Sequence, residues 1–165
     1  MNFELTAPAK SARISLSSSA VIVSVDVNVW TATKQDRVIS NEVTTLKNAS
    51  ADAGKFTKNL LANCPQHKAL LNYRQTIYNW LQRSTYAWAG GMQVLPTINL
   101  EKFKAEYEAH EREFAKLLAE FEAIYPSLVS DAAFKQGDMF NRSDYPDVQE
   151  IRGKFRMKMF VTKVP

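Results

Sequence analysis

The sequence predicts one α+β domain spanning residues 1–165, in which three long helices accompany a small sheet made by the N- and C-terminal strands. The helices are expected to form an antiparallel hairpin or bundle with a heptad seam. Two observations favour this class: apolar residues alternate with period two near both ends of the chain, and they recur at three- and four-residue steps between those ends. No internal repeat or linker suggests a second domain.

The two strands are expected over residues 20–31 and 155–163. In the first strand, five alternate valines between positions 21 and 29 fall on one face, whereas Ser24, Asp26 and Asn28 fall on the other. In the last strand, the residues that share one face are Met157, Met159 and Val161. Each strand therefore has one face suited to burial, and we expect the two strands to meet in one sheet.

Helical spacing predicts three long helices and a short one, over about 36–63, 66–89, 99–125 and 146–154. Pro65 ends the first, and Gly90-Gly91 ends the second. Asn99 is a plausible N-cap for the third, and Pro146 suits the first residue of the fourth. The residues "MQVLP" after the glycines are expected to be a short extended segment.

The third helix carries a heptad seam with charged residues on its outer side. Its apolar positions alternate at three- and four-residue steps: Leu100, Phe103, Tyr107, His110, Phe114, Leu117, Phe121 and Ile124. Because this spacing holds for more than three repeats, we expect the seam to pack against another helix.

The second helix has an apolar stripe and a polar face. With Ile77 at the centre of the stripe and 100° per residue, Trp80 and Trp88 both fall on it, so both are expected in the core. Tyr86 falls on the opposite face, close to Lys68 and Arg83. No acidic residue occurs between 65 and 98. A tyrosine among cations and amides is a composition that binds phosphates and stacks on bases, although a solvated helix face has the same composition.

The composition restricts the class of protein. The net charge of +4 is compatible with nucleic acid or acidic partners. The single cysteine, Cys64, excludes an internal disulfide and favours a reducing compartment. No apolar run approaches the roughly 20 residues of a membrane span, and the N-terminus lacks the pattern of a signal peptide. We therefore expect a cytoplasmic protein with no membrane contact, in the host cytoplasm if it is phage-encoded.

No catalytic or metal-binding motif is complete. "HEREF" has Phe114 where a zinc helix needs its second histidine, and Cys64 lacks the oriented base of a nucleophilic cysteine. The acidic cluster Asp138, Asp144 and Asp147 does not have the spacing of a calcium loop. We expect a protein that is not an enzyme, with no metal and no cofactor.

The order of three segments resembles a known pattern. "VNVWTATKQD" precedes a long helix, "WAGGMQVLP" precedes the heptad helix, and "FNRSDYPDVQEIRGKF" precedes a strand ending "VTKVP". In this the chain is similar to an uncharacterised family of bacteriophage and mobile-element proteins. The residues that carry the resemblance are Trp30, Gly90, Gly91, Leu95, Pro96, Tyr145, Pro146, Phe155, Val164 and Pro165. It implies a phage context and no particular activity, and Gln93 stands where the family has a basic residue.

Two hypotheses about function stay open. The first is a non-enzymatic nucleic-acid-binding protein, acting on single strands, with DNA favoured, in replication or recombination. Its candidate binding residues are Lys68, Arg74, Arg83, Tyr86, Arg152, Lys154, Arg156 and Lys158. The second is a protein-interaction module, whose seam or strand edges bind another copy of the chain or a phage or host protein and which ignores nucleic acid.

Overall fold

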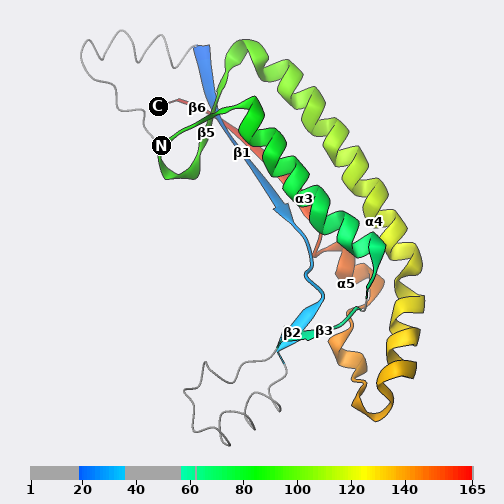
Figure 1. Ribbon diagram of the computed structural model, residues 1–165. Coiled ribbons are helices and arrows are strands. Elements are labelled where there is room, and N and C mark those ends of the chain that lie inside the picture. Colours follow the sequence, from blue (N-terminus) through cyan, green and yellow to red (C-terminus); the bar gives the residue numbers. More distant parts are fainter. Residues whose placement is uncertain (1–18, 36–56, 62, 165) are drawn as a thin grey trace, which may run out of the picture.

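The computed structural model describes residues 19–35, 57–61 and 63–164 (Figure 1). They form a four-stranded antiparallel sheet, a two-stranded antiparallel sheet and three α-helices. The predicted α+β class is therefore confirmed. The two longer helices lie on the same side of the four-stranded sheet (Figure 1). We call the sheet face toward these helices the inner face and the opposite one the outer face.

The four-stranded sheet has the order β4-β5-β1-β6. Its strands are β1 (Ala20–Asn28), β4 (Tyr86–Ala87), β5 (Gln93–Pro96) and β6 (Arg156–Lys163). β1 and β6 pair antiparallel along their length, with Val25 opposite Met159. The two ends of the described chain thus meet in one sheet, as their alternation predicts. The valines of β1 belong to the main core on the inner face, whereas Asp26 and Asn28 are exposed on the outer face.

The second predicted helix is shorter than expected. α3 (Pro65–Ser84) ends where Thr85 turns to extended backbone, with φ −136° and ψ 173°. The Thr85 hydroxyl donates to the carbonyl of Leu81, at 2.6 Å, and so takes the place of the backbone donor that a further turn would supply. The placement of Tyr86 and Trp88 on a helix is therefore wrong.

Tyr86 and Trp88 instead lie in a hairpin that joins β4 to β5. Tyr86 pairs with Val94, and the amide of Trp88 donates to the carbonyl of Met92. The turn between them contains Gly90 and Gly91 at φ 77° and 76°, a region that β-carbon sterics close to most residues. The glycines thus turn the chain between two strands and do not end a helix.

The expectation of three long helices is overstated. α4 (Leu100–Gln136) has 37 residues, α3 has 20 and α5 (Val148–Arg152) has 5. α4 continues past the predicted end at residue 125, through Pro126. Its additional turns pack through Leu128 and Val129 against buried side chains of the protein. The local sequence does not specify this contact. Its stabilisation outweighs the loss of the helical hydrogen bond that the Pro126 nitrogen cannot donate.

α3 and α4 run antiparallel along each other. Trp80 stacks on Phe103 with ring centroids 4.6 Å apart, and His67 approaches Phe121 at 5.6 Å, so contacts at the end of α3 match the start of α4. Among the predicted seam positions, Phe103, Tyr107, Phe114 and Phe121 are buried; Leu100, His110, Leu117 and Ile124 are partly buried. Trp80 lies in this core as expected, whereas Trp88 packs on the outer face of the sheet.

The predicted helix 36–63 lies mostly outside the described residues, and its last part is wrong. β3 (Thr57–Asn59) pairs antiparallel with β2 (Thr33–Gln35). Asn63, with φ 43°, interrupts any helix before Pro65.

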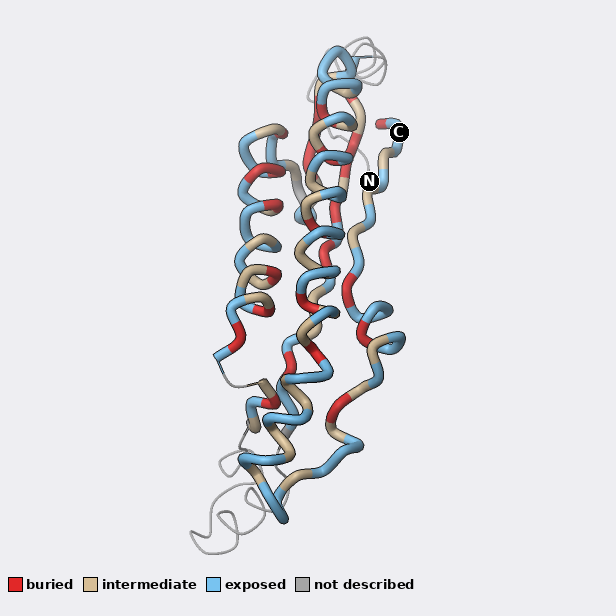
Figure 2. The backbone as a smooth tube through the Cα atoms, turned by 90° about the vertical axis from the view of Figure 1, so that its right-hand side faces the viewer, coloured by how far each residue is buried: buried red, intermediate tan, exposed pale blue. Residues whose placement is uncertain are grey.

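The main core lies between α3, α4 and the inner face of the sheet. Figure 2 shows buried positions recurring at intervals along both helices and along the strands. The side chains without measurable exposure include Val23, Leu70, Ile77, Phe121 and Ile151. This core holds the end of α3, the β4–β5 hairpin and the start of α4 in one place.

Candidate nucleic-acid interface

A cavity of about 480 Å³ lies at the junction of α3, β4 and the first turns of α4. Its apolar floor consists of Trp80, Leu95 and Phe103. The Trp80 indole is fixed in place, because it stacks on Phe103 and its N–H donates to the Glu106 carboxylate at 3.4 Å. Trp80 and Phe103 are only 6% and 2% exposed, so the floor is a firmly packed apolar base and not an open stacking surface.

The rim of the cavity is polar and carries two cations and one anion. Arg83 comes from the last turn of α3, and Lys102 and Glu106 come from α4. Neither Arg83 nor Lys102 has an ion-pair partner among the side chains that the structure describes. Asn99 also lines the cavity, and although it stands at the predicted N-cap, its side chain makes no capping hydrogen bond. These groups remain able to bind a ligand.

His110 lies close enough to Glu106 and Arg83, two residues that line the cavity, for their charges to change its pKa. Its Nδ1 atom lies 2.6 Å from the Tyr73 hydroxyl, so the histidine is satisfied within the seam, as expected. Burial lowers the pKa of His110 below 6.5; Glu106 raises it, and the positive charge of Arg83 lowers it further. His110 is thus neutral at neutral pH, and it contributes no charge next to Arg83.

An exposed aromatic side chain stands at the mouth. Tyr86, which lines the cavity, is 69% exposed. The extended backbone of β4 projects Tyr86 from the sheet, whereas the neighbouring Thr85 points inward and is buried. A large ring held in solvent beside two cations can stack on a planar ligand.

The other predicted residues on α3 lie outside this cavity. The Lys68 ammonium donates to the side chain of Asn63 at 2.8 Å, and the Arg74 guanidinium lies over the Tyr78 ring at 5.7 Å. The Tyr78 hydroxyl in turn accepts a hydrogen bond from the amide of Val27 in β1. Lys68 and Arg74 are therefore engaged in local structure.

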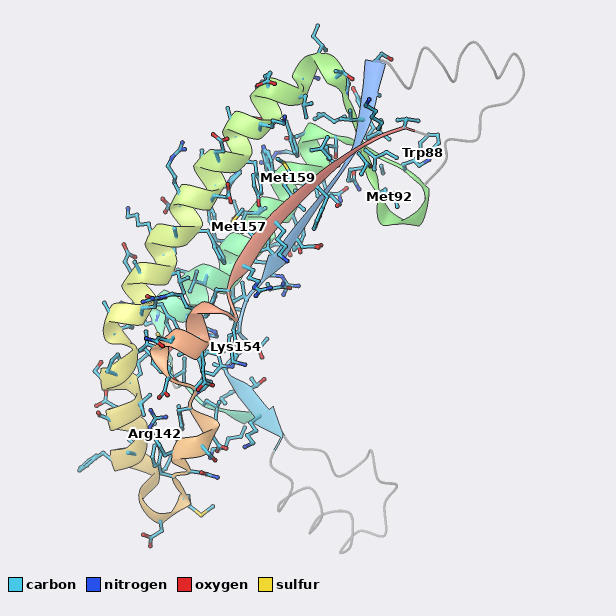
Figure 3. The ribbon with its side chains drawn as sticks, turned by 180° about the vertical axis from the view of Figure 1, so that it is seen from behind. Trp88, Met92, Arg142, Lys154, Met157 and Met159 are labelled. Carbon is cyan, nitrogen blue, oxygen red and sulfur yellow. The ribbon has the colours of Figure 1, made fainter. Side chains whose placement is uncertain are left out.

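The basic residues near the C-terminus form a second group. Arg152 binds the carboxylate of Glu122 with two hydrogen bonds of 3.0 and 3.1 Å, so its charge is already paired. Lys154 is exposed at the turn before β6 (Figure 3), and Arg156 and Lys158 are exposed on the outer face of β6. Of the eight predicted residues, the structure thus brings Arg83 and Tyr86 together at the cavity, and Arg156 and Lys158 together on β6.

Three further residues of the site were not predicted as binding residues from the sequence: Lys102, Asn99 and Phe160. Lys102 and Asn99 belong to a different helix from Arg83, and only the antiparallel packing of α3 and α4 places them together. Phe160 had a visible signal, because the alternation that partly buries Met157 and Met159 projects Phe160 to the opposite face with Lys158.

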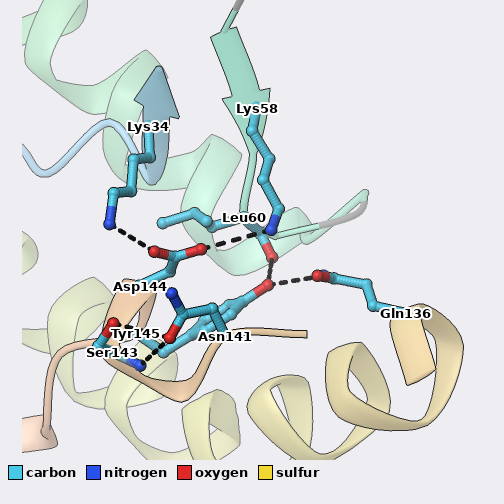
Figure 4. Close-up of polar contacts among 8 residues, drawn as sticks. All are labelled: Lys34, Lys58, Leu60, Gln136, Asn141, Ser143, Asp144 and Tyr145. Atoms are coloured by element: carbon cyan, nitrogen blue, oxygen red, sulfur yellow. Dashed lines mark hydrogen bonds and ion pairs between the residues drawn. The ribbon is translucent and has the colours of Figure 1, made fainter. Parts of the chain in front are cut away.

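Two of the three acidic residues near 138–147, Asp144 and Asp147, make structural contacts. Asp144 accepts hydrogen bonds from Lys34 at 2.5 Å and Lys58 at 3.3 Å, which stand opposite each other in β2 and β3 (Figure 4). Asp147 pairs with Arg142. In the described ranges, no three His, Cys, Asp or Glu side chains gather as metal ligands would.

Comparison with protein-family models, with curated proteins and with solved structures finds no match to the chain. The bacteriophage resemblance therefore stays a prediction. Within the part of the chain that the structure describes, no helix has both the length and the apolarity to cross a bilayer.

Proposed function

We propose that the protein binds single-stranded nucleic acid without reacting with it, and that the cavity beside Tyr86 holds one nucleotide. A role in replication or recombination of phage or mobile-element DNA is the context that the resemblance implies. The observation that carries the proposal is the meeting of Arg83, Tyr86 and Lys102 around one cavity.

The dimensions and chemistry of the cavity suit a nucleotide. Pockets for small ligands range from about 300 to 1,000 Å³ and have a few converging polar groups. The cavity of about 480 Å³ falls in this range. Arg83 and Lys102 supply charge for a phosphate, and Tyr86, on the edge strand with its side chain directed to the outer face, supplies a ring for a base at the rim. The negative charge of Glu106 repels a second phosphate in the cavity. The site therefore favours a nucleotide with one phosphate over a polyphosphate.

Single strands suit this site better than duplexes. In a duplex the base faces are covered by stacking, so the exposed Tyr86 ring would have no base face to contact. A single strand can insert an unstacked base and keep its phosphates at the rim. We therefore expect a preference for single strands, with an affinity that falls as salt rises.

The test is fluorescence anisotropy of labelled single-stranded and duplex oligonucleotides, titrated at low and at physiological salt. We expect Tyr86→Ala to weaken single-strand binding by the equivalent of about 1–3 kcal/mol, the usual value of one stacked base. Arg83→Ala should also reduce the slope of log affinity against log salt by about 0.7, the value for one phosphate contact on a single strand.

Matched controls separate the site from general basicity. Arg112 is another exposed arginine, ten residues beyond Lys102 on α4 and so about 15 Å along the helix axis. Arg112→Ala should leave both the affinity and the salt slope nearly unchanged. Absence of binding by the unaltered protein at low salt would overturn the proposal, and equal losses in the Arg83 and Arg112 variants would overturn the assignment to the cavity.

A second candidate function is association with protein through β6. Within the described residues, β6 pairs with β1 alone and its other edge carries no strand. An open edge offers backbone donors and acceptors to a strand of a second copy or of another protein.

A further inference from the structure

We infer that the nucleic-acid path continues from the cavity across the outer face of the four-stranded sheet, where Phe160 is a second base-stacking side chain. This inference rests on the proposed function and extends it, because it assigns the ligand a minimum length and a direction across the strands.

The strand register places Tyr86 and Phe160 on the same face. Tyr86 stands opposite Val94, which stands opposite Ile22, which stands opposite Thr162. Residues opposite each other point to the same side, and so do residues two apart in a strand, so Phe160 shares this side. The two rings lie on strands three spacings apart, about 14 Å at the usual distance between strands. One nucleotide does not connect them, so the ligand must be an oligonucleotide.

The surface between the two rings is apolar. Its base is a cluster of Ala20, Ile22, Val94 and Val164, against which Trp88 and Met92 pack while staying partly exposed. Trp88 and Met92 lie in the β4–β5 hairpin, at the far end of the sheet from Lys154 (Figure 3). The four cluster residues are at most 8% exposed, so Trp88 and Met92 present the accessible part of this apolar surface, which excludes phosphates and suits the flat faces of bases.

The basic side chains of β6 lie where the sugar-phosphate backbone of a strand bound by its bases would run. Phe160, which is 51% exposed, has Lys158 two residues before it on the same face, and Arg156 follows in the same direction. Residues 151–164 contain no aspartate or glutamate. Asp26, opposite Lys158, is the acidic side chain of β1 on this face. Positive charge next to an exposed ring on a sheet is the arrangement with which proteins bind single strands of tolerant sequence.

The experiment measures affinity as a function of ligand length. Labelled oligothymidines of about 4, 8 and 16 nucleotides, which span known single-strand site sizes, are titrated against the full chain at low salt. We expect the unaltered protein to gain affinity with length. Phe160→Ala should lose at least about five-fold in affinity for the longest ligand and leave the shortest unchanged. Tyr86→Ala should weaken binding at every length.

Two further variants test the reason for any loss. Phe160→Leu keeps an apolar side chain and removes the ring, so stacking predicts that it behaves as Phe160→Ala does. Phe134, which is 90% exposed near the far end of α4, provides the matched control, and Phe134→Ala should bind as the unaltered protein does.

The outcomes distinguish this inference from the proposed function. Normal binding of all lengths by Phe160→Ala overturns the sheet path and leaves the cavity assignment intact. Loss at Phe160 without loss at Tyr86 supports the sheet path and overturns the cavity. If no oligonucleotide binds the unaltered protein, both are overturned.

Discussion

At the scale of single residues, Thr85 decides where α3 ends and how Tyr86 is presented. Its hydroxyl lies 2.6 Å from the Leu81 carbonyl, to which it donates, and 2.9 Å from the side-chain amide of Gln93. All of these groups are withdrawn from water, since Thr85 and Gln93 are buried. One hydroxyl thus connects the helix end to β5.

We predict that Thr85→Val, which keeps the shape and removes the hydroxyl, lowers the free energy of unfolding by about 1–3 kcal/mol, because it leaves buried polar groups unpaired. Thr76→Val is the control. The Thr76 hydroxyl also bonds a carbonyl four residues earlier, that of Asn72, but in an exposed position where water can replace it. Urea unfolding of both variants tests this, and equal losses would contradict the role of burial.

At the scale of elements, Asp144 joins the β2–β3 pair to the segment that follows α4. Its side chain is 6% exposed and accepts from both lysines, one on each strand. The hydrogen bond from Lys34, aided by that from Lys58, holds the pKa of Asp144 below 3.8 although burial acts to raise it. Nearby, the Tyr145 hydroxyl donates to the carbonyl of Leu60 and accepts from Gln136 (Figure 4). Ion pairs and neutral hydrogen bonds therefore both hold the segment after α4 against the β2–β3 pair.

The lowered pKa predicts a loss of stability in acid. The contribution of Asp144 is fully present above its unfolded value of 3.8 and disappears as the pH falls through the lower folded value, because protonation removes the ion pairs. Asp144→Asn should therefore be less stable at neutral pH and should lose less on acidification than the unaltered protein does. Thermal unfolding followed by circular dichroism at neutral and acidic pH measures both effects.

Asp147→Asn is the control for that experiment. Asp147 pairs with Arg142 at 3.1 Å, but its side chain is 73% exposed, and such a pair contributes at most about 1 kcal/mol. The pH dependence of this variant should match that of the unaltered protein. If the two variants behave alike in acid, the special position of Asp144 is contradicted.

At the scale of the whole molecule, the sheet ends in an edge whose outward backbone groups can be identified. The Val27 amide bonds the Tyr78 hydroxyl, so it does not bond Met157, the residue opposite. In an antiparallel pair this means that Met157, and with it Met159 and Val161, directs its backbone groups away from β1. Among the described residues no strand pairs with these groups, so they can accept another strand.

Self-association through this edge predicts a particle of twice the 18.7 kDa of the chain in light scattering after size-exclusion chromatography. Val161→Pro removes an outward donor and spares the ladder to β1, so it should return the protein to a monomer without unfolding it. A monomer at every accessible concentration of the unaltered protein would contradict self-pairing. The charges of Arg156 and Lys158 oppose such pairing and favour the nucleic-acid hypothesis.

The sequence by itself determined the α+β class, the burial faces of β1 and β6, and the buried positions of the α4 seam. These features follow from local periodicity, since a period of two or of 3.6 residues specifies which side of an element is apolar. The same alternation already separates Phe160 and Lys158 from Met157 and Met159.

Only the tertiary structure decided where α3 and α4 end, that Tyr86 lies on a strand, and which cations surround it. Thr85 stops α3 by contacts with β5, and α4 passes Pro126 because its last turns pack on a core built by distant residues. The partners of Arg83, Lys102 and Asp144 likewise come from elements far apart in the chain. Such contacts depend on how elements pack, which local propensity does not encode.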